Sequence, residues 1–510
     1  MPETYPYMKG PFEPSFESLY NFHCPEWFRD AKFGLWSHWG AQSVPMYGDW
    51  YARNMYIEGS DQYLYHLRHY GHPSKFGYKD LVKLWKAENF DPEELMDLYV
   101  RAGAKYFFAQ TTHHDNFFNY DSKLQPFNSV NYGPYRDIVA EWRAAALKRG
   151  LKFGITEHLG ASFEWLNTTK GCDAHGPYAG VPYDGNDKRY EQLYLDNAEY
   201  LDLSKPRMHY THDKRWPPRW YECVREMVDL FEPDMLYSDG AVPFYAKGAT
   251  IHDPTYESGL KMVAHLYNGS AAQNGGANQR IYFQKDSRPE FFRIGLLDIE
   301  RSLEDDIKPL PWQTDTCLGH WFYDVRAQYK DHRQVIGLLV DIVSKNGNLL
   351  LNVPQRPDGT IDEECRFTLE KIAHWISVCG EGIYGTRPYH VYGEGPTRLN
   401  ADKRDKAIQS ALRTLAPGAT IYNREADAQW TPWDIRYTQK EAEGKVYAFV
   451  MGDARAVSLT QLKEPEKVAS VRLLGCGSVP FHTEGGVLNA YLPERLPCEM
   501  ANCLEIVTRP

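Results

Sequence analysis

Short apolar segments recur through the first 390 residues of the chain, and longer segments with helical spacing of apolar residues separate them. The apolar segments cover residues 33–38, 105–112, 152–158, 235–239, 280–284, 295–300 and 348–353. Strands that are apolar on both faces are typical of a parallel sheet buried beneath helices. Repeated alternation of strand and helix over this length predicts an α/β fold, a (β/α)8-like barrel.

The helices between these strands carry recognisable start and stop signals. Asp91 is a favourable N-cap and precedes Pro92, which predicts a helix over 92–102. Gly150 predicts the end of a helix over 135–149. Further helical patterns cover 221–231 and 367–378. These helices are long enough to cover the outside of a barrel.

The texture of the sequence changes near residue 390. Beyond it the apolar runs are short and turns are frequent, as at 446–451, 470–474 and 504–507, with one weak helical pattern over 405–412. This predicts a small all-β sandwich. The chain is therefore divided into a barrel domain at 1–390 and a C-terminal β-sandwich domain at 391–510. Within the barrel, 160–206 lacks periodicity and is interpreted as long loops on the rim.

The charge balance excludes several classes of partner. The 510 residues include 57 basic and 68 acidic ones, for a formal charge of −11. This argues against nucleic acid and against an anionic membrane surface as partners. The apolar run at 335–343 is interrupted by Asp341 and is too short to span a membrane. The first eleven residues lack an apolar signal core, so we expect a cytoplasmic protein or a secreted one whose signal has been removed.

Polar residues cluster where the predicted strands end, which in a barrel is the face that carries active sites. They are His38, His113, His114, Glu157, His158, Asp239 and Glu300. A carboxyl group at the end of a buried strand is costly unless it is paired or functional. Asp239 and Glu300 together offer the two carboxyl groups that glycoside hydrolysis needs. The sequence therefore favours a glycosidase.

The sequence gives little support for metal or nucleotide chemistry. The nine cysteines include no CxxC pair, so we expect reduced thiols rather than a disulfide framework or a zinc ribbon. His113 and His114 are adjacent and would point to opposite faces of a strand. A metal-dependent hydrolase with scattered ligands remains an alternative, but we predict no metal and no cofactor, since no HExxH, Walker or GxGxxG motif occurs.

Several ordered segments resemble the motifs of the α-L-fucosidases of glycoside hydrolase family 29. They are 32–45, 48–56, 103–117, 148–154, 233–240, 297–301, 311–316, 343–354 and 357–360. The resemblance implies a barrel with a C-terminal β domain and an exo-acting, retaining hydrolysis of terminal α-L-fucosides through a covalent glycosyl-enzyme intermediate. It implies a fucosylated oligosaccharide or glycoconjugate as the substrate, and neither a metal nor a cofactor. A homo-oligomer is compatible with the sequence.

The resemblance also assigns roles to individual residues. Asp239 would be the nucleophile and Glu300 the general acid and base. Trp321 would form an aromatic wall, and Arg280 is a weaker candidate for a contact near the nucleophile. The residues that would hold sugar hydroxyls are His38, Asp49, Trp50, His113 and His114.

Two positions depart from the family pattern and leave alternatives open. Position 49 is Asp where many members carry Glu, and 157–158 reads Glu-His where a tyrosine is familiar. Glu157 or His158 in the pocket could bind an additional hydroxyl, which would favour an α-L-galactosidase. We favour the other interpretation, in which Glu157 and His158 support other residues from behind the pocket or cap loops. A sugar-binding protein on an inactive hydrolase scaffold is the alternative from another functional class, and both carboxyl groups argue against it.

Overall fold

The computed structural model describes residues 5–203, 209–244, 250–399 and 428–509. Eight parallel strands close into a barrel in sequence order, since β1 pairs with β2 on one side and with β8 on the other. They are β1 (Phe33–Ser37), β2 (Tyr106–Gln110), β3 (Lys152–Glu157), β4 (Met235–Ser238), β5 (Ile281–Gln284), β6 (Leu296–Asp298), β7 (Trp312–Cys317) and β8 (Gly347–Asn352). Of these strand residues only Lys152 is not buried, which explains their continuous apolar character. The predicted barrel is confirmed.

Strand β7 is the one barrel strand that no predicted apolar segment covers. It contains Gln313, Thr314 and Asp315, yet every residue in it is buried. Gln313 accepts a hydrogen bond from the Tyr106 hydroxyl at 2.9 Å and donates to Asp298 Oδ2 at 2.7 Å. Buried polar groups are tolerated when they are hydrogen-bonded to one another, and such a strand is invisible to a search for apolar runs.

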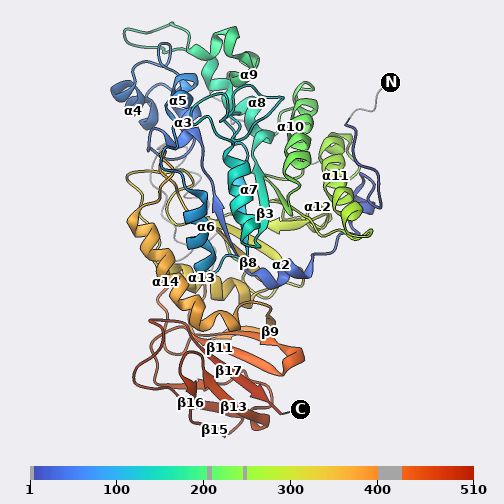
Figure 1. Cartoon of the computed structure of the whole chain (residues 1–510), viewed down its shortest axis with the longest axis vertical. Coiled ribbons are helices and arrows are strands. Elements are labelled where there is room, and N and C mark those ends of the chain that lie inside the picture. The colour runs from blue at the N-terminus through green and yellow to red at the C-terminus, as the bar shows by residue number, and fades with distance from the viewer. Residues whose placement is uncertain (1–4, 204–208, 245–249, 400–427, 510) are drawn as a thin grey trace.

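Helices surround the barrel, as Figure 1 shows. The long ones are α6 (Pro92–Arg101), α7 (Ile138–Lys148), α10 (Trp216–Phe231), α11 (Glu257–Gln273), α13 (His332–Ser344) and α14 (Glu363–Cys379). Asp91 caps α6 by accepting hydrogen bonds from two backbone amides, as predicted. Helix α7 begins three residues later than expected because the side chain of Asp137 caps it.

The rim segment predicted as loops contains short helical turns, including α8 (Ser162–Trp165) and α9 (Glu191–Tyr194). Asp184 anchors it to the segment after β1. Its carboxylate accepts hydrogen bonds from the hydroxyls of Tyr56 and Tyr194, each at 2.7 Å. Since these partners are buried, the rim has a fixed shape around the mouth of the barrel.

The C-terminal region forms two antiparallel sheets. One has the order β14-β13-β17-β11-β10-β9 and the other β12-β16-β15. The strands are β9 (Arg387–Glu394), β10 (Ile435–Lys440), β11 (Lys445–Val450), β12 (Ala456–Leu459), β13 (Val468–Leu473), β14 (Gly477–Ser478), β15 (Phe481–Glu484), β16 (Val487–Tyr491) and β17 (Asn502–Thr508). Strand β9 spans the predicted boundary at residue 390. The weak helical pattern at 405–412 lies outside the described residues.

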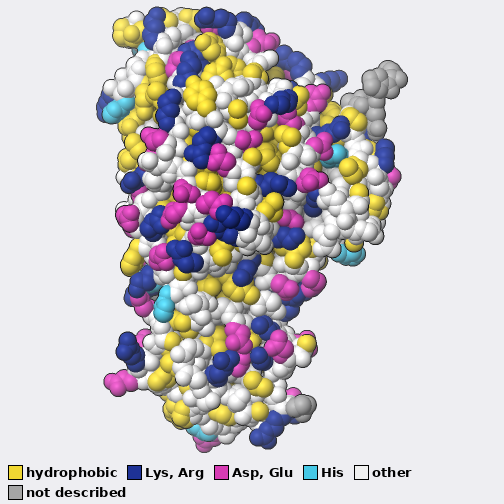
Figure 2. All heavy atoms as spheres, viewed as in Figure 1, with side chains coloured by type: hydrophobic (Ala, Val, Ile, Leu, Met, Phe, Trp, Pro, Cys, Tyr) yellow, Lys and Arg dark blue, Asp and Glu magenta, His cyan; other side chains and the backbone are white. Residues whose placement is uncertain are grey.

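The β domain packs against the end of the barrel opposite the rim (Figure 1). The indole of Trp375 on α14 packs on Phe449 of β11, with ring centroids 6.1 Å apart, and donates to the Ala501 carbonyl oxygen. Figure 2 shows acidic and basic side chains interspersed over this face of the molecule, without a continuous basic surface there. Within the described ranges, we find no helix with the length and apolar character to cross a bilayer.

Candidate active site

The carboxyl ends of the barrel strands surround a cavity of about 320 Å³. Nine of the eleven predicted site residues line it, namely His38, Asp49, Trp50, His113, His114, His158, Asp239, Glu300 and Trp321. Six further lining residues were missed by the sequence analysis: Trp36, His209, Tyr237, Gly240, Lys285 and Asp315. The site is therefore an aromatic-walled pocket with ionisable groups on its floor.

Asp239 and Glu300 meet in this cavity from two different strands. Asp239 directly follows β4, and Glu300 lies two residues beyond β6. The ammonium nitrogen of Lys285 lies 3.0 Å from Asp239 Oδ1 and 2.8 Å from Glu300 Oε2. Two oxygens that share one nitrogen cannot be further apart than the sum of these distances, so they lie within 5.8 Å of each other.

The environment of Asp239 favours its ionised form. Besides Lys285, His114 approaches it, with Nε2 at 3.3 Å from Oδ2. Burial disfavours the charged carboxylate, but the charge of Lys285 and the hydrogen bond from His114 outweigh it, and the pKa of Asp239 lies well below its usual range. The carboxylate is therefore an anion at neutral pH.

Glu300 is the more exposed of the two carboxyl groups. Its side chain is 35% accessible to solvent, against 18% for Asp239. The Trp321 indole donates to Glu300 Oε1 at 3.2 Å, which fixes the carboxyl plane beside the aromatic wall. A carboxyl group that is held in place and reached by solvent is suited to exchange protons with a bound molecule and with water.

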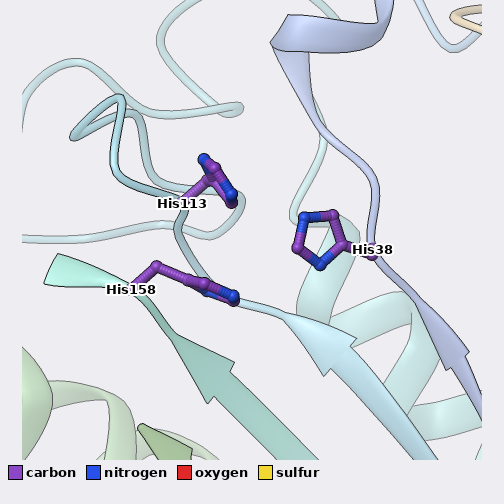
Figure 3. A group of neighbouring side chains, drawn as sticks. All are labelled: His38, His113 and His158. Atoms are coloured by element: carbon purple, nitrogen blue, oxygen red, sulfur yellow. The ribbon is translucent and has the colours of Figure 1, made fainter. Parts of the chain in front are cut away.

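Three histidines from different strand ends face one another across the cavity floor (Figure 3). The ring centroids of His38 lie 5.0 Å from those of His113 and 5.1 Å from those of His158. Burial lowers the pKa of all three, to about 3 for His158 and well below the usual range for the others. The rings are therefore neutral near pH 7, and each presents one donor and one acceptor nitrogen.

The hydrogen bonds behind the rings determine which ring nitrogen carries the proton, and therefore whether the nitrogen at the cavity donates or accepts. Gln42 Nε2 donates to His113 Nδ1 at 2.8 Å, and the Gln42 orientation is fixed because its Oε1 accepts from the Ala52 amide. His113 thus carries its proton on Nε2. His158 Nδ1 donates to the Thr112 carbonyl oxygen at 3.2 Å, which leaves Nε2 as an acceptor. The two rings can bind one hydroxyl group, since His113 donates to it and His158 accepts from it.

These three histidines are also a candidate cation site, because their ligand atoms lie within 4.8 Å of one another. A zinc ligand needs a free lone pair on the nitrogen that faces the ion, at about 2.0–2.1 Å. His113 instead presents an N–H group, because Gln42 donates to its other nitrogen. The donor set therefore suits a hydroxyl group better than a metal ion.

Two predicted site residues do not reach the cavity. Glu157 lies behind it, where Oε2 accepts from the Leu159 amide at 2.9 Å and the Trp220 indole at 3.2 Å. Arg280 immediately precedes β5 and therefore lies at the amino end of the barrel, where it donates to Gln273 Oε1. The expectation that Arg280 contacts the nucleophile region is thus corrected: a residue before a parallel strand cannot share a face with residues that follow one.

The missed residues differ in how visible they were in the sequence. Lys285 directly follows the predicted strand 280–284, so the rule that selected the other strand ends would have selected it. Asp315 belongs to β7, which was not predicted. His209, whose Nε2 donates to the Asp239 carbonyl oxygen at 2.6 Å, comes from a rim loop without a sequence signal.

Comparison with known proteins gives a consistent result. The family model for α-L-fucosidase matches residues 3–381. Rat tissue α-L-fucosidase is 28% identical over 449 residues, which cover 82% of this chain and 86% of that protein. Human tissue α-L-fucosidase is 29% identical over 400 residues, covering 76% of this chain and 74% of that protein.

Solved structures agree with the sequence relatives. The crystal structure of Thermotoga maritima α-fucosidase is 26% identical, with a TM-score of 0.70 over 97% of this chain and all of that one. An α-L-fucosidase from Bacteroides thetaiotaomicron is 16% identical and shares the fold, with a TM-score of 0.61 over the full length of both chains. The family match over three quarters of the sequence, together with this fold, identifies the chain as a member of the α-L-fucosidase family of glycoside hydrolases.

Proposed function

We propose that this protein is an exo-acting α-L-fucosidase that retains the anomeric configuration through a covalent glycosyl-enzyme intermediate. The observation that carries this proposal is the closeness of two carboxylate oxygens, Asp239 Oδ1 and Glu300 Oε2, which lie within 5.8 Å of each other. Retaining glycosidases have carboxyl groups about 5–5.5 Å apart, whereas inverting ones need about 6.5–9.5 Å to admit a water molecule. The structure of the Bacteroides relative is titled as a trapped covalent intermediate, which supports the same mechanism here.

In the first step Asp239 attacks the anomeric carbon as an anion and forms an ester bond. The bond from that carbon to the leaving oxygen breaks, and Glu300 gives its proton to this oxygen. In the second step Glu300 removes a proton from water, which attacks the anomeric carbon and releases Asp239. His38, His113 and His158 bind hydroxyl groups, and Trp321 packs on the sugar.

The cavity supports recognition of a single terminal sugar. Its volume of about 320 Å³ lies at the lower end of the range for ligand pockets. A Thermotoga maritima α-fucosidase structure is titled as a complex with fucose. A Thermotoga maritima α-L-fucosynthase structure is titled as a complex with a fucosyl-fucose azide. We infer that the substrates are fucosylated oligosaccharides or glycoconjugates cleaved from their ends.

An α-L-galactosidase is the second candidate, and the observation that favours it is His158 in the cavity wall. Its acceptor nitrogen could bind the 6-hydroxyl that distinguishes L-galactose from L-fucose. Glu157 does not contribute to this alternative, since its carboxylate is bonded behind the pocket.

Release of nitrophenol from nitrophenyl α-L-fucoside and α-L-galactoside by wild type and by Asp239→Ala tests the proposal. We expect faster turnover of the fucoside, a loss of at least about a thousandfold in the variant, and partial rescue by azide. Asp453→Ala, which removes an exposed carboxylate paired with Arg455, is the matched control. Faster turnover of the galactoside would identify the protein as an α-L-galactosidase instead. Turnover of neither substrate would favour a sugar-binding protein.

A further inference from the structure

Lys285 is the cation that the two proposed catalytic carboxyl groups share. Its backbone amide donates to the Gly240 carbonyl oxygen at 2.7 Å, which ties the end of β5 to the residue after Asp239. Its ammonium group contacts Asp239 and Glu300 at 3.0 and 2.8 Å. The Lys285 side chain is only 18% exposed, so most of it is buried between these groups.

A third carboxylate sits below this ammonium group. Asp315 Oδ2 lies 3.8 Å from Lys285 Nζ and accepts from the Tyr237 hydroxyl at 2.8 Å. Asp298 lies beside Asp315, and both are buried. Burial raises the pKa of both, and the charge of Asp315 raises that of Asp298 well above its usual range. Asp315 is therefore a third carboxyl group within reach of Lys285.

The proposed reaction moves one negative charge across Lys285. Before the first step Asp239 is ionised and Glu300 carries a proton. Afterwards Asp239 is a neutral ester and Glu300 is ionised, because its proton has left with the departing oxygen. Hydrolysis reverses both changes. Both carboxyl groups already lie at hydrogen-bond distance from one nitrogen, so no side chain has to move to follow the charge.

We propose that Lys285 stays ionised throughout the cycle and exchanges its carboxylate partner, from Asp239 in the free enzyme to Glu300 in the glycosyl-enzyme and back on hydrolysis. This inference rests on the proposed function. It makes Lys285 a positioning residue that acts on both steps through the two carboxyl groups.

Lys285 remains charged because its carboxylate neighbours outnumber it. Burial lowers its pKa, but the charges of Asp239, Asp315 and Glu300 outweigh burial, and the pKa lies well above the usual range. It therefore does not titrate where the enzyme works. The other titratable groups around it are Tyr237, His38, His114, His158 and His209.

Removal of this charge affects both limbs of the pH profile. Without Lys285, Asp239 and Glu300 both bind a proton more tightly. The acid limb, set by ionisation of Asp239, and the basic limb, set by proton loss from Glu300, then both move to higher pH. An opposite charge at this distance shifts a carboxyl pKa by about one to three units.

The experiment compares kcat/KM against pH for wild type, Lys285→Met and Lys285→Arg, on an alkyl α-L-fucoside. An alkyl leaving group needs the general acid, so the basic limb is visible beside the acid limb that Asp239 sets. We expect the Lys285→Met profile to move as a whole by about one pH unit or more to the alkaline side. Lys285→Arg should keep both limbs near their wild-type positions.

A second variant restores the charge chemically. Lys285→Cys should show the displaced profile, and its alkylation by bromoethylamine, which adds an ammonium group, should return both limbs to their original pH. Wild type treated in the same way controls for reaction at the other cysteines. This rescue also excludes misfolding as the cause of the displacement, and L-fucose binding checks that the pocket is intact.

Two results would overturn the inference. Limbs that stay in place under a uniformly lower curve would make Lys285 a structural residue, and movement of one limb would assign it to one carboxyl group only. Failure of the proposed function looks different, since wild type would then not hydrolyse fucosides or Asp239→Ala would keep its activity.

Discussion

Two clusters of buried charged residues lie at opposite ends of the barrel. They differ in whether their polar atoms are all hydrogen-bonded within the protein. In the catalytic cluster, Lys285 is shared among three carboxyl groups, while both ring nitrogens of His38 have no hydrogen-bond partner among the residues that the structure describes. In the cluster between barrel and β domain, Asp341 of α13 accepts from Arg436 of β10 at 2.6 Å and from Lys345 at 2.7 Å.

The second cluster is saturated, by which we mean that its charged side chains are hydrogen-bonded within the protein. The guanidinium group of Arg436 also donates to the carbonyl oxygens of Ile435 and Thr397. Arg436 and Asp341 are completely buried. The cationic groups of Arg436 and Lys345 both lie over the ring of Tyr392. Saturation fixes one geometry, as a domain contact requires. In the catalytic cluster, polar atoms that are not hydrogen-bonded within the protein can bond to a ligand. Leaving them unpaired lowers the folding stability but allows the ligand to bind.

Glu300→Gln should break the catalytic cluster with the largest effect, and that effect should fall on activity. The amide cannot donate or accept a catalytic proton, so we expect a loss of about 10²–10⁴-fold on an alkyl fucoside. The loss should be smaller in the first step with a nitrophenyl fucoside, whose leaving group needs no acid. Kinetics on both substrates check this.

Glu304→Gln is the control for this substitution, because Glu304 is paired with Lys308 four residues along the chain. It should leave the rates on both substrates unchanged. Equal losses on the alkyl and nitrophenyl substrates in Glu300→Gln would show that Glu300 does not act as the general acid.

Asp341→Asn should break the saturated cluster with a comparable effect, but on stability. Removal of the one carboxylate leaves Arg436 and Lys345 charged and buried, which costs about 3–5 kcal/mol. The folded fraction should keep wild-type kcat/KM, because the cluster lies far from the cavity. Urea unfolding followed beside kinetics measures both. Simultaneous replacement of all three residues by Leu or Met should recover most of the loss, and a cost below about 1 kcal/mol for Asp341→Asn would contradict the argument.

Part of the catalytic cluster could be predicted from the sequence, whereas the saturated cluster could not. Strand ends mark the catalytic face, so His38, Asp239 and Glu300 could be predicted from strand order alone. In the sequence Asp341 appeared only as an interruption in an apolar run, because its partner Arg436 lies 95 residues away on another domain. Pairings of that kind are set by tertiary packing and leave no local pattern.

The errors in the predicted site have equally physical reasons. The family resemblance suggested a contact between Arg280 and the nucleophile region although Arg280 begins a predicted strand, an error that strand direction alone could have prevented. Asp315 was missed because β7 is polar, and the role of Glu157 depends on Trp220, a contact 63 residues away in sequence. Sequence order predicted which face carries the site but not which side chains turn into it.

Glu157→Gln should show how much folding stability a buried carboxyl group behind the site costs when it ionises. Burial raises the pKa of Glu157 from 4.5 to about 7. The folded state therefore binds this proton more tightly than the unfolded state, and the stability it contributes below about pH 4.5 is lost as pH rises towards 7. The loss is on the order of 3 kcal/mol.

Unfolding free energies of Glu157→Gln and wild type between pH 5 and 8 measure this effect. The variant should gain stability relative to wild type as pH rises, and the ratio of fucoside to galactoside turnover should stay the same. A difference in stability that does not vary with pH would mean that Glu157 keeps an ordinary pKa.

Glu499→Gln should have the smallest effect, although Glu499 bridges the same two domains as the saturated cluster. Its carboxylate contacts three basic side chains, Lys371 at 2.6 Å, His332 at 3.0 Å and Arg333 at 3.2 Å, whereas Asp341 contacts two. Glu499 is 45% exposed, however, so water solvates the charges when the pairs are broken. We expect a cost below about 1 kcal/mol that disappears in high salt. Urea unfolding of this variant beside Asp341→Asn, at low and high ionic strength, tests whether burial or the number of ion pairs determines the stability of the domain contact. Equal costs for the two variants would refute the role of burial, because burial is the main difference between the two carboxylates.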